Sequence, residues 1–259
     1  MRIFVTGASG FIGSAVVPEL IGAGHQVLGL ARSDASAAAL RTAGADVHRG
    51  DLDDPGSLRS GAQDADGVVH LAFVHDFNEF AAASEIDRRA IEALGETLAA
   101  SDRPLVVASG TTGIRLGEIS TEDDVVMPGL PRVSEATALA FADRGVRSSV
   151  VRLPPSVHGP GDHGFVPQLI EIARARGESG YPGDGSNRWP ARDIAGIIAR
   201  QLQLPVTRIA PDAVPEHFGW IGTFFSLDVP ASSAHTRERF GWTPTEIGLL
   251  DDLALGYYF

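Results

Sequence analysis

Met1-Arg-Ile-Phe-Val-Thr-Gly-Ala-Ser-Gly-Phe-Ile-Gly-Ser14 is the stretch that decides the fold of this 259-residue chain. The apolar run Ile3–Val5 predicts a buried strand, and a helical pattern of apolar residues follows the glycines. Gly7 permits a tight turn, Gly10 lets a pyrophosphate approach the backbone, and Gly13 lets the helix pack against the sheet. The stretch therefore predicts a strand–turn–helix unit that holds a dinucleotide at the helix N-terminus. The alternative is the same unit without a ligand.

The composition excludes several classes of partner. The net charge is −12 and the basic residues form no stripe, which argues against a nucleic acid partner. No apolar run reaches about 18 residues, so we predict no membrane span. A signal peptide is not expected, because the chain begins with its first core strand. The sequence leaves open whether the protein forms a homo-oligomer.

Two residue types are missing from the chain. The absence of cysteine excludes disulfides, thiolate nucleophiles and cysteine zinc sites, and we expect a cytoplasmic protein. No grouping of histidine and acidic residues has metal-ligand spacing, so no metal is predicted. All 21 basic residues are arginine, so no Schiff-base or phosphate-loop lysine can operate here.

Strand and helix patterns alternate through the first 150 residues or so, which predicts an α/β fold, a doubly wound parallel Rossmann sheet. The predicted strands are Arg2–Thr6, Gln26–Ala31, Asp46–Arg49, Val68–Ala72, Leu105–Ser109 and Ser148–Leu153. The predicted helices are Phe11–Ala23, Ala35–Ala43, Pro55–Gly61, Asn78–Ala100, Val133–Arg144, Phe165–Arg176, Arg192–Gln203 and Pro211–Phe218. We place a dinucleotide-binding domain at residues 1–153 and a smaller, partly helical substrate-binding lobe at 154–259.

The chain resembles the extended short-chain dehydrogenase/reductases, the group that includes nucleotide-sugar epimerases and dehydratases. The matching segments, in order along the chain, are Thr6-Gly-Ala-Ser-Gly-Phe-Ile-Gly13, Gly50-Asp-Leu52, Val68-Val-His-Leu-Ala72, Val106-Val-Ala-Ser109, Val151-Arg-Leu-Pro154, Val157-His-Gly-Pro-Gly-Asp162, Gly241-Trp-Thr-Pro244 and Asp252-Leu253. The resemblance covers essentially the whole chain. It implies a Rossmann sheet, a small C-terminal substrate lobe and a nicotinamide dinucleotide cofactor.

The chain differs from that family in its catalytic residues. The family's general acid is a tyrosine with a lysine four residues later. Counting back from Glu135, which resembles the glutamate after that pair, the two positions hold Met127 and Pro131. The chain therefore resembles an atypical member that lacks the usual acid.

A second departure lies at Arg188-Trp-Pro-Ala-Arg192. Relatives carry a further strand–helix unit of roughly 30–40 residues between these positions. The sequence leaves open whether the protein is natively shorter near residues 191–192 or joins two separated segments.

The resemblance assigns the cofactor-binding residues. The loop residues are Gly7, Ser9, Gly10, Phe11, Ile12 and Gly13, and those after later strands are Asp51, Leu52, Leu71, Ala72, Phe73, Pro154 and Ser156. Arg32 and Ser33 follow the second strand, where the family reads the ribose. An arginine there clasps a 2′-phosphate, so we predict NADP rather than NAD. Asp34 is the alternative, as a displaced ribose-binding acid or a helix N-cap.

The catalytic and substrate residues are inferred from the same resemblance. Thr111 matches the family's catalytic serine or threonine, whose hydroxyl hydrogen-bonds the substrate carbonyl, and Ser109 and Thr112 are alternates. Such a hydroxyl cluster is otherwise ordinary turn chemistry. His75 and His158 are candidate proton donors because imidazole titrates near pH ~6.5, although loop histidines are often structural. The predicted pocket residues are His75, His158, Phe165 and Trp189, and the aromatic ones fit a core position equally well.

Three functions are compatible with these features. The first is an NADP-dependent oxidoreductase acting on a small carbonyl or alcohol substrate. The second is a non-catalytic NADP-binding sensor or regulatory protein, favoured by the missing acid. The third, weaker alternative is a nucleotide-sugar epimerase or dehydratase.

Overall fold

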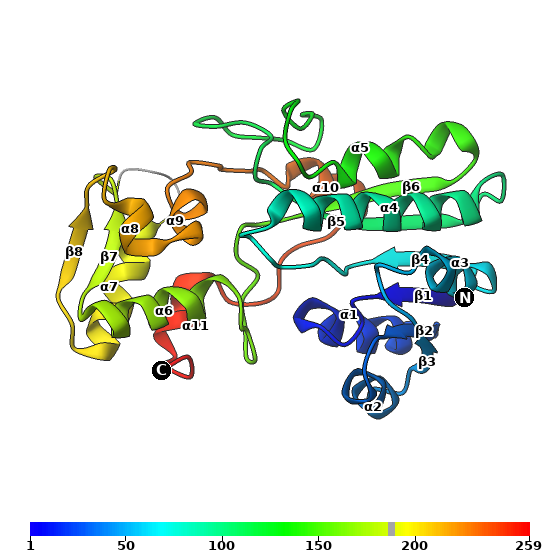
Figure 1. Ribbon diagram of the computed structural model, residues 1–259, viewed down its shortest axis with the longest axis horizontal. Coiled ribbons are helices and arrows are strands. Elements are labelled where there is room, and N and C mark those ends of the chain that lie inside the picture. Colours follow the sequence, from blue (N-terminus) through cyan, green and yellow to red (C-terminus); the bar gives the residue numbers. More distant parts are fainter. Residues whose placement is uncertain (186–189) are drawn as a thin grey trace. The chain divides into compact units, whose positions relative to one another are not determined.

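The computed structural model describes residues 1–185 and 190–259 (Figure 1). The strands are β1 (Arg2–Thr6), β2 (Gln26–Ala31), β3 (Asp46–Arg49), β4 (Gly67–His70), β5 (Pro104–Gly110), β6 (Arg147–Leu153), β7 (Ser179–Pro182) and β8 (Val206–Ile209). The helices are α1 (Phe11–Gly22), α2 (Asp34–Thr42), α3 (Pro55–Gln63), α4 (Phe80–Leu98), α5 (Ser134–Leu139), α6 (Phe165–Arg176), α7 (Ala191–Leu202), α8 (Val214–Phe218), α9 (Trp220–Phe225), α10 (Ala234–Phe240), α11 (Leu249–Ala254) and the 3-10 helix η1 (Ala142–Arg144).

The described residues form two compact units. The first unit contains Met1–Ser109 and Gly129–Arg152, and the second contains Gly110–Pro128 and Leu153–Phe259. Segment 110–128 thus belongs to the second unit, although it lies between the two pieces of the first.

The first unit is built on a parallel six-stranded sheet of order β3-β2-β1-β4-β5-β6. Strand β1 lies in the middle and pairs with β2 on one side and β4 on the other. Because the chain moves outward from β1 in both directions, the strand order reverses between β1 and β4, which is where ligands bind in such sheets. The predicted doubly wound Rossmann sheet is confirmed.

Alternation along β1 divides the core of the first unit between the two faces of the sheet. Phe4 packs into one cluster, together with residues of α3, α4 and β5. Ile3 and Val5 pack into the other cluster, together with residues of α1 and α2. Side chains of a strand alternate between faces, so both faces of this strand must be apolar. The helices on both faces of the sheet meet that requirement (Figure 1).

Glycines end the first two helices as their positions suggest. The C-caps are Ala23 and Ala43, and the residues that follow, Gly24 and Gly44, adopt left-handed φ values of 82° and 83°. Glycine is favoured there because its missing Cβ removes the steric cost of that conformation.

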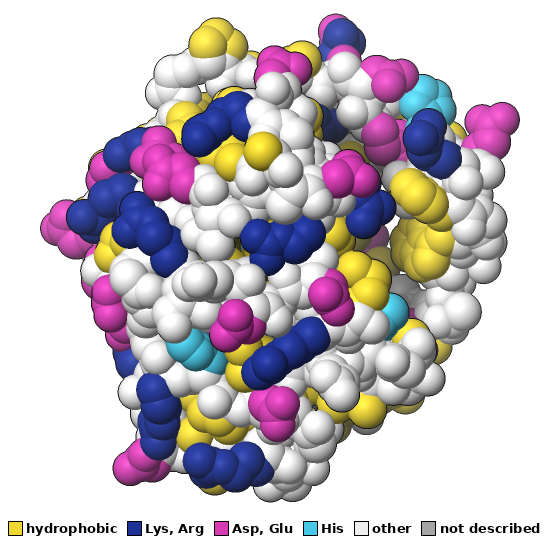
Figure 2. Space-filling view, turned by 90° about the vertical axis from the view of Figure 1, so that its right-hand side faces the viewer, with side chains coloured by type: hydrophobic (Ala, Val, Ile, Leu, Met, Phe, Trp, Pro, Cys, Tyr) yellow, Lys and Arg dark blue, Asp and Glu magenta, His cyan; other side chains and the backbone are white. Residues whose placement is uncertain are grey.

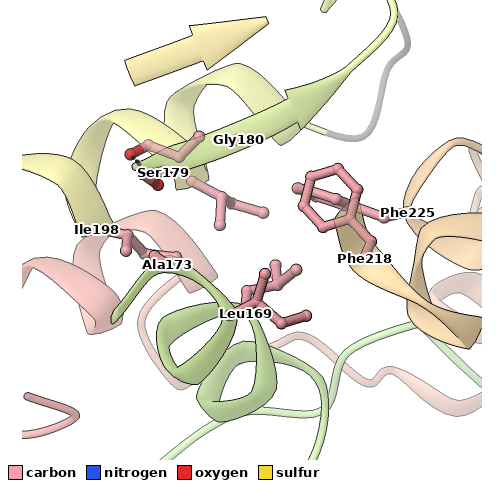
Figure 3. Close-up of a pocket in the computed structure, with 10 residues that line it drawn as sticks. Leu169, Ala173, Ser179, Gly180, Ile198, Phe218 and Phe225 are labelled. Carbon is pink, nitrogen blue, oxygen red and sulfur yellow. Dashed lines mark hydrogen bonds between the residues drawn. The ribbon is translucent and has the colours of Figure 1, made fainter. Parts of the chain in front are cut away.

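The second unit has its own apolar core. Strands β7 and β8 form a two-stranded parallel sheet, which the sequence patterns did not predict. Figure 3 shows the interior beside β7, where Leu169 of α6, Phe218 of α8 and Phe225 of α9 line the same pocket as Gly180. Ser179 supplies a hydroxyl there, and it donates to the carbonyl of Ala195 over 2.9 Å. This pocket is therefore part of the hydrophobic core, with its polar group already satisfied.

Candidate functional site

The glycine-rich loop joins β1 to α1, and two of its glycines lie close against backbone atoms. Gly7 adopts a left-handed φ of 68°, and a Cβ on it would lie 2.7 Å from the backbone nitrogen of Ala72. A Cβ on Gly13 would lie 2.2 Å from the carbonyl oxygen of Gly7. Real Cβ atoms do not approach backbone this closely, so both positions require glycine. They fix the turn and the packing of the helix, as the sequence indicates.

Gly10 has a different role in the same loop. It is exposed, and a Cβ there would meet just one neighbouring atom among the described residues, the Gly7 carbonyl oxygen at 3.2 Å. A side chain at Gly10 would therefore have to displace this carbonyl by a few tenths of an ångström, far less than at Gly7 or Gly13. As the N-cap of α1, it offers no side-chain oxygen to the N–H groups of the first turn, which also holds no acidic residue. Such a helix terminus fits a pyrophosphate, because its N–H groups and dipole favour an anion.

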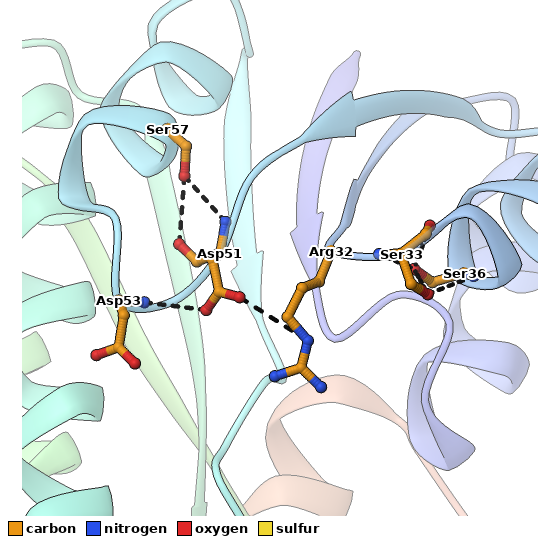
Figure 4. Close-up of polar contacts among 6 residues, drawn as sticks. All are labelled: Arg32, Ser33, Ser36, Asp51, Asp53 and Ser57. Atoms are coloured by element: carbon orange, nitrogen blue, oxygen red, sulfur yellow. Dashed lines mark hydrogen bonds and ion pairs between the residues drawn. The ribbon is translucent and has the colours of Figure 1, made fainter.

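The end of β2 carries the residues predicted to read the ribose (Figure 4). The Arg32 side chain is 81% exposed, and its Nε lies 3.8 Å from Oδ2 of Asp51. Ser33 is the N-cap of α2, and its hydroxyl accepts the Ser36 N–H over 3.1 Å. Asp34 is the first residue of that helix and pairs with Arg49. Arg32 is therefore open to solvent at the end of β2, with Asp51 as its acidic neighbour.

The other residues of the first unit that are predicted to bind the cofactor lie after its strands. Leu52 and Leu71 are partly buried against the two cores of the sheet, so both have a packing role. Ala72 lies against Gly7, and the next residue, Phe73, is partly exposed. Gly7 and Ala72 thus meet at the carboxyl edge of the sheet.

A chain of buried polar groups runs behind the loop. The Thr6 Oγ1 lies 2.8 Å from Nδ1 of His70, and the Nε2 of His70 lies 3.1 Å from Oδ1 of Asp87 in α4. Ser134 donates to the other oxygen of Asp87 over 2.5 Å. All four side chains are at most 1% exposed. Because a carboxylate only accepts hydrogen bonds, the neutral His70 ring carries its proton on Nε2 and accepts the Thr6 hydroxyl at Nδ1.

Asp87 remains a carboxylate inside this network. Burial on its own would raise the pKa of Asp87, but hydrogen bonds from His70 and Ser134 lower the pKa by more, so it lies below its usual value.

Arg132 ends the network at the sheet edge. Its Nε donates to Ser134 over 2.9 Å and its Nη2 to the carbonyl of Ala108 over 3.0 Å. Its guanidinium carbon lies 4.3 Å from the centre of the Phe73 ring. Burial lowers the pKa of Arg132, against the opposing effect of the Asp87 charge. Arg132 was not predicted from the sequence, because nothing in its spacing distinguishes it from the other arginines.

Three hydroxyls of the second unit are buried without a hydrogen-bond partner among the described residues. Two of them belong to predicted site residues, Thr111 and Ser156, which are 9% and 8% exposed, and the third belongs to Ser120. The backbone N–H of Thr111 donates to the carbonyl of Leu153 over 3.0 Å, which ties the segment after β5 to the end of β6. A buried hydroxyl is rarely left unpaired, so each is suited to a ligand oxygen. The neighbouring Pro154 is exposed.

The alternate hydroxyls flank Thr111 in the chain. Ser109 is buried and belongs to the first unit, while Thr112 is partly buried and belongs to the second.

The two candidate proton donors have different surroundings. In the first unit, His75 is exposed, and its ring centre lies 5.5 Å from that of Phe73. In the second unit, the Nδ1 of His158 lies 2.8 Å from Oδ2 of Asp252, which also accepts a hydrogen bond from the Tyr257 hydroxyl. A carboxylate at Nδ1 fixes the tautomer of His158 and leaves Nε2 to exchange a proton.

Two predicted pocket residues remain, Phe165 and Trp189. Phe165 packs edge-on against Phe225 at 5.7 Å and is partly buried against the core. Trp189 lies outside the described residues. Tyr181 of β7 packs against the same core.

The described part of the chain has neither a metal site nor a membrane-spanning helix. No group of three histidine or acidic side chains there could hold a metal ion. No described helix is long and apolar enough to cross a membrane. Figure 2 shows arginine and acidic side chains interspersed on one face of the molecule.

Comparison with known proteins identifies related sequences and structures. The family model for the NAD dependent epimerase/dehydratase family matches residues 3–111. An uncharacterized protein of Schizosaccharomyces pombe is 43% identical over 100% of both chains. The 2-alkyl-3-oxoalkanoate reductase of Stenotrophomonas maltophilia is 30% identical over 73% of this chain and 60% of its own. The fold is shared with dTDP-glucose 4,6-dehydratase of Streptomyces venezuelae, solved with NAD, at a TM-score of 0.74 and 20% identity over 99% of this chain and 95% of that one.

The fission-yeast relative is longer than this chain. The alignment extends over 295 positions and this chain has 259 residues, so at least 36 positions of the relative have no counterpart here. The difference has the size of the strand–helix unit of roughly 30–40 residues that the family carries near Arg188–Arg192.

Proposed function

We propose that the chain, which belongs to the NAD dependent epimerase/dehydratase family, is an NADP-dependent oxidoreductase acting on a small carbonyl or alcohol substrate. The glycine-rich loop carries this proposal, because Gly10 leaves the helix terminus open and packing restricts it far less than Gly7 and Gly13. The first unit supplies the cofactor site, and the second supplies the substrate lobe. The name of the Stenotrophomonas relative, a reductase of an oxoalkanoate, supports a carbonyl substrate.

The residues of the loop and of the end of β2 hold the cofactor in this proposal. The first turn of α1 binds the pyrophosphate, and Arg32 binds the 2′-phosphate that distinguishes NADP. A nicotinamide cofactor, when bound, supplies or accepts a hydride. Asp51 restrains Arg32, so the preference for NADP over NAD is expected to be moderate.

The chain's own hydroxyls polarise the substrate. The Thr111 hydroxyl, buried without a described partner, donates to the substrate carbonyl oxygen, with Ser109 and Thr112 as alternates. A donor positioned for a developing oxyanion contributes on the order of 10²–10³ in rate. The proton comes from water or from a histidine, since neither a lysine nor the tyrosine of the usual pair is present. Of the two histidines, His158 is the better prepared, because Asp252 orients its ring.

A non-catalytic NADP-binding sensor is the second candidate. The observation that favours it is the replacement of the usual tyrosine and lysine by Met127 and Pro131.

Two measurements on the wild-type protein test the proposal. NADPH should raise the melting temperature, because binding to the folded state alone stabilises it. NADPH should also be oxidised in the presence of some members of a panel of ketones, aldehydes and oxo acids. A shift in melting temperature without turnover on any of them would favour the sensor. No shift with either NADPH or NADH would contradict both candidates.

A further inference from the structure

The segment after β4 and the Arg132 guanidinium form one continuous surface in the first unit. The Phe73 ring contacts the guanidinium on one side, and its centre lies 6.1 Å from that of Phe80 on the other. Phe77 stacks on Phe80 with ring centres 6.0 Å apart. All three rings and Arg132 are partly exposed. A cation and an aromatic wall therefore lie side by side.

This surface lies at the carboxyl edge of the sheet. Strand β4 ends at His70, which is in register with Val107 of β5. The carbonyl that holds Arg132 belongs to the next residue, Ala108. The ends of β1 and β4 meet at the same level, where the strand order reverses. Ligands of open parallel sheets bind at this edge.

The charge of Arg132 is not directly paired. Its hydrogen bonds go to a hydroxyl and a backbone carbonyl, and no described carboxylate lies within 4.0 Å of its nitrogens. The nearest acidic group in the network, Asp87, is reached only through Ser134. Nη1 has no hydrogen-bond partner in the described part of the chain. A half-buried guanidinium that lacks a carboxylate is prepared for a bidentate anionic ligand.

We propose that Arg132 and the rings of Phe73, Phe77 and Phe80 form the binding site for the acidic and apolar parts of the substrate, which makes the substrate an apolar carboxylic acid that also carries the reacting carbonyl. The proposal rests on the proposed oxidoreductase function for the reaction, but the binding site itself does not require turnover. The guanidinium fork binds the carboxylate, and the aromatic rings contact the hydrocarbon chain. The Ser134–Asp87–His70 network holds the guanidinium in place.

Matched pairs of compounds separate the contribution of the carboxylate charge from that of the hydrocarbon chain of the substrate. Octanoate and 1-octanol test binding by calorimetry on the NADPH-loaded protein, and 3-oxooctanoate and its methyl ester test turnover. The wild type should bind octanoate in preference to 1-octanol and reduce the acid in preference to the ester. Arg132→Met keeps most of the side-chain length and removes the charge. It should weaken octanoate binding and lower kcat/KM for the acid by about 10- to 100-fold, the value of a charge-assisted hydrogen bond. The ester and NADPH should be little affected.

Arg144 provides the control, because its guanidinium lies 4.7 Å from the centre of the Phe141 ring in the same unit but is exposed. Arg144→Met should leave all four probes unchanged. If Arg132→Met fails to fold, Arg132→Lys keeps the charge without the fork, and its loss of octanoate affinity should be smaller but measurable. That variant and the wild-type preference for octanoate over 1-octanol still decide the question.

The outcomes distinguish this proposal from the proposed function. Octanoate binding that depends on Arg132, without turnover of any carbonyl, would support the binding site and overturn the oxidoreductase. Turnover that is equally impaired for the acid and the ester in Arg132→Met would overturn the carboxylate site. A loss of NADPH affinity in the same variant would also overturn it, because the cation would then serve the cofactor.

Discussion

The glycine-rich loop and the Arg132 network lie in the same unit and serve the same sheet edge, but they are assembled differently. The loop is made by three glycines within seven consecutive residues, and their spacing alone specifies a turn and a helix start. The network collects side chains from four places in the chain, and its hydrogen bonds join residues 64, 17 and 47 positions apart.

This difference determines how each region should respond to change. The loop acts by leaving space, so a larger residue blocks the ligand without leaving any group unpaired. The network acts by pairing buried polar groups, so removal of one member leaves its neighbours unsatisfied, at a cost of about 1–3 kcal/mol each. Loop substitutions should therefore separate binding from stability, whereas network substitutions should affect stability first.

The largest expected effect is the loss of cofactor binding in Gly10→Val. The side chain would stand where the pyrophosphate approaches the helix terminus, while its Cβ would meet one described protein atom, the Gly7 carbonyl oxygen at 3.2 Å. We expect a folded protein whose melting temperature no longer rises with NADPH.

Two glycines of the same helix provide the comparison. Gly22→Val, with no neighbouring atom within 4 Å of a Cβ, should keep the response to NADPH. Gly13→Val should unfold the protein, because its Cβ would overlap the Gly7 carbonyl. If NADPH still raised the melting temperature of Gly10→Val, this result would contradict the assignment of the loop as the pyrophosphate site.

The second effect concerns the rate of reaction. Thr111→Val keeps the shape and removes a buried hydroxyl that has no described partner, so kcat should fall on the order of 10²- to 10³-fold. Tyr181→Phe should be nearly silent, because Tyr181 packs against the core of the second unit. If Thr111→Val were silent and Tyr181→Phe inactive, the proton donor of the reaction would be Tyr181 of β7. Steady-state kinetics of both variants, on a carbonyl compound that the wild type reduces, decide between these outcomes.

Most of the strands that the sequence predicts well contain β-branched and apolar runs. Strands β1, β2 and β3 have the predicted bounds, and β5 and β6 differ by one residue at one or both ends. The predicted strand Val68–Ala72 was too long at its end, because β4 ends at His70 and leaves Leu71 and Ala72 outside the strand. Strands β7 and β8 were missed, because each has only four residues, too few to show a clear alternation, and β7 also contains Gly and Pro. The helix expected over Val133–Arg144 splits into α5 and η1.

The residues of the candidate site also differ in how far the sequence could predict them. Residues that act through local backbone geometry, such as Gly7 and Gly13, could be assigned from spacing. Arg132 could not, because its importance comes from burial beside Phe73 and from its link to Asp87, and sequence spacing contains neither. The hydroxyls of Thr111 and Ser156 were chosen by resemblance, and only the structure reveals that both are buried without a described partner.

The third effect tests the network through the pH dependence of stability. Because the pKa of Asp87 is lowered on folding, its charge contributes stability at pH values above its unfolded pKa of about 3.9. That contribution is lost as the pH falls through the lower, folded pKa. Asp87→Asn should therefore reduce the free energy of unfolding at pH 7 by about 1–3 kcal/mol, and the difference from wild type should shrink in acid.

Urea denaturation at a series of pH values measures the effect of Asp87→Asn. Asp143→Asn, on the exposed turn η1, is the control and should change little at any pH. A constant difference between Asp87→Asn and wild type across the acid range would mean that the Asp87 charge does not stabilise the fold.

The smallest effect is expected at the exposed end of the cofactor site, where Arg32→Ala should weaken NADPH binding by about 10- to 100-fold and leave NADH little affected. We expect a value near the tenfold end, because the side chain is 81% exposed and Asp51 already lies 3.8 Å away. Asp51→Asn sharpens the test, since it frees the guanidinium and should strengthen NADPH binding. Calorimetry with both cofactors measures these changes. Equal losses for NADPH and NADH in Arg32→Ala, or a wild-type preference for NADH, would assign the ribose instead to Asp51, whose carboxylate would accept the 2′-hydroxyl.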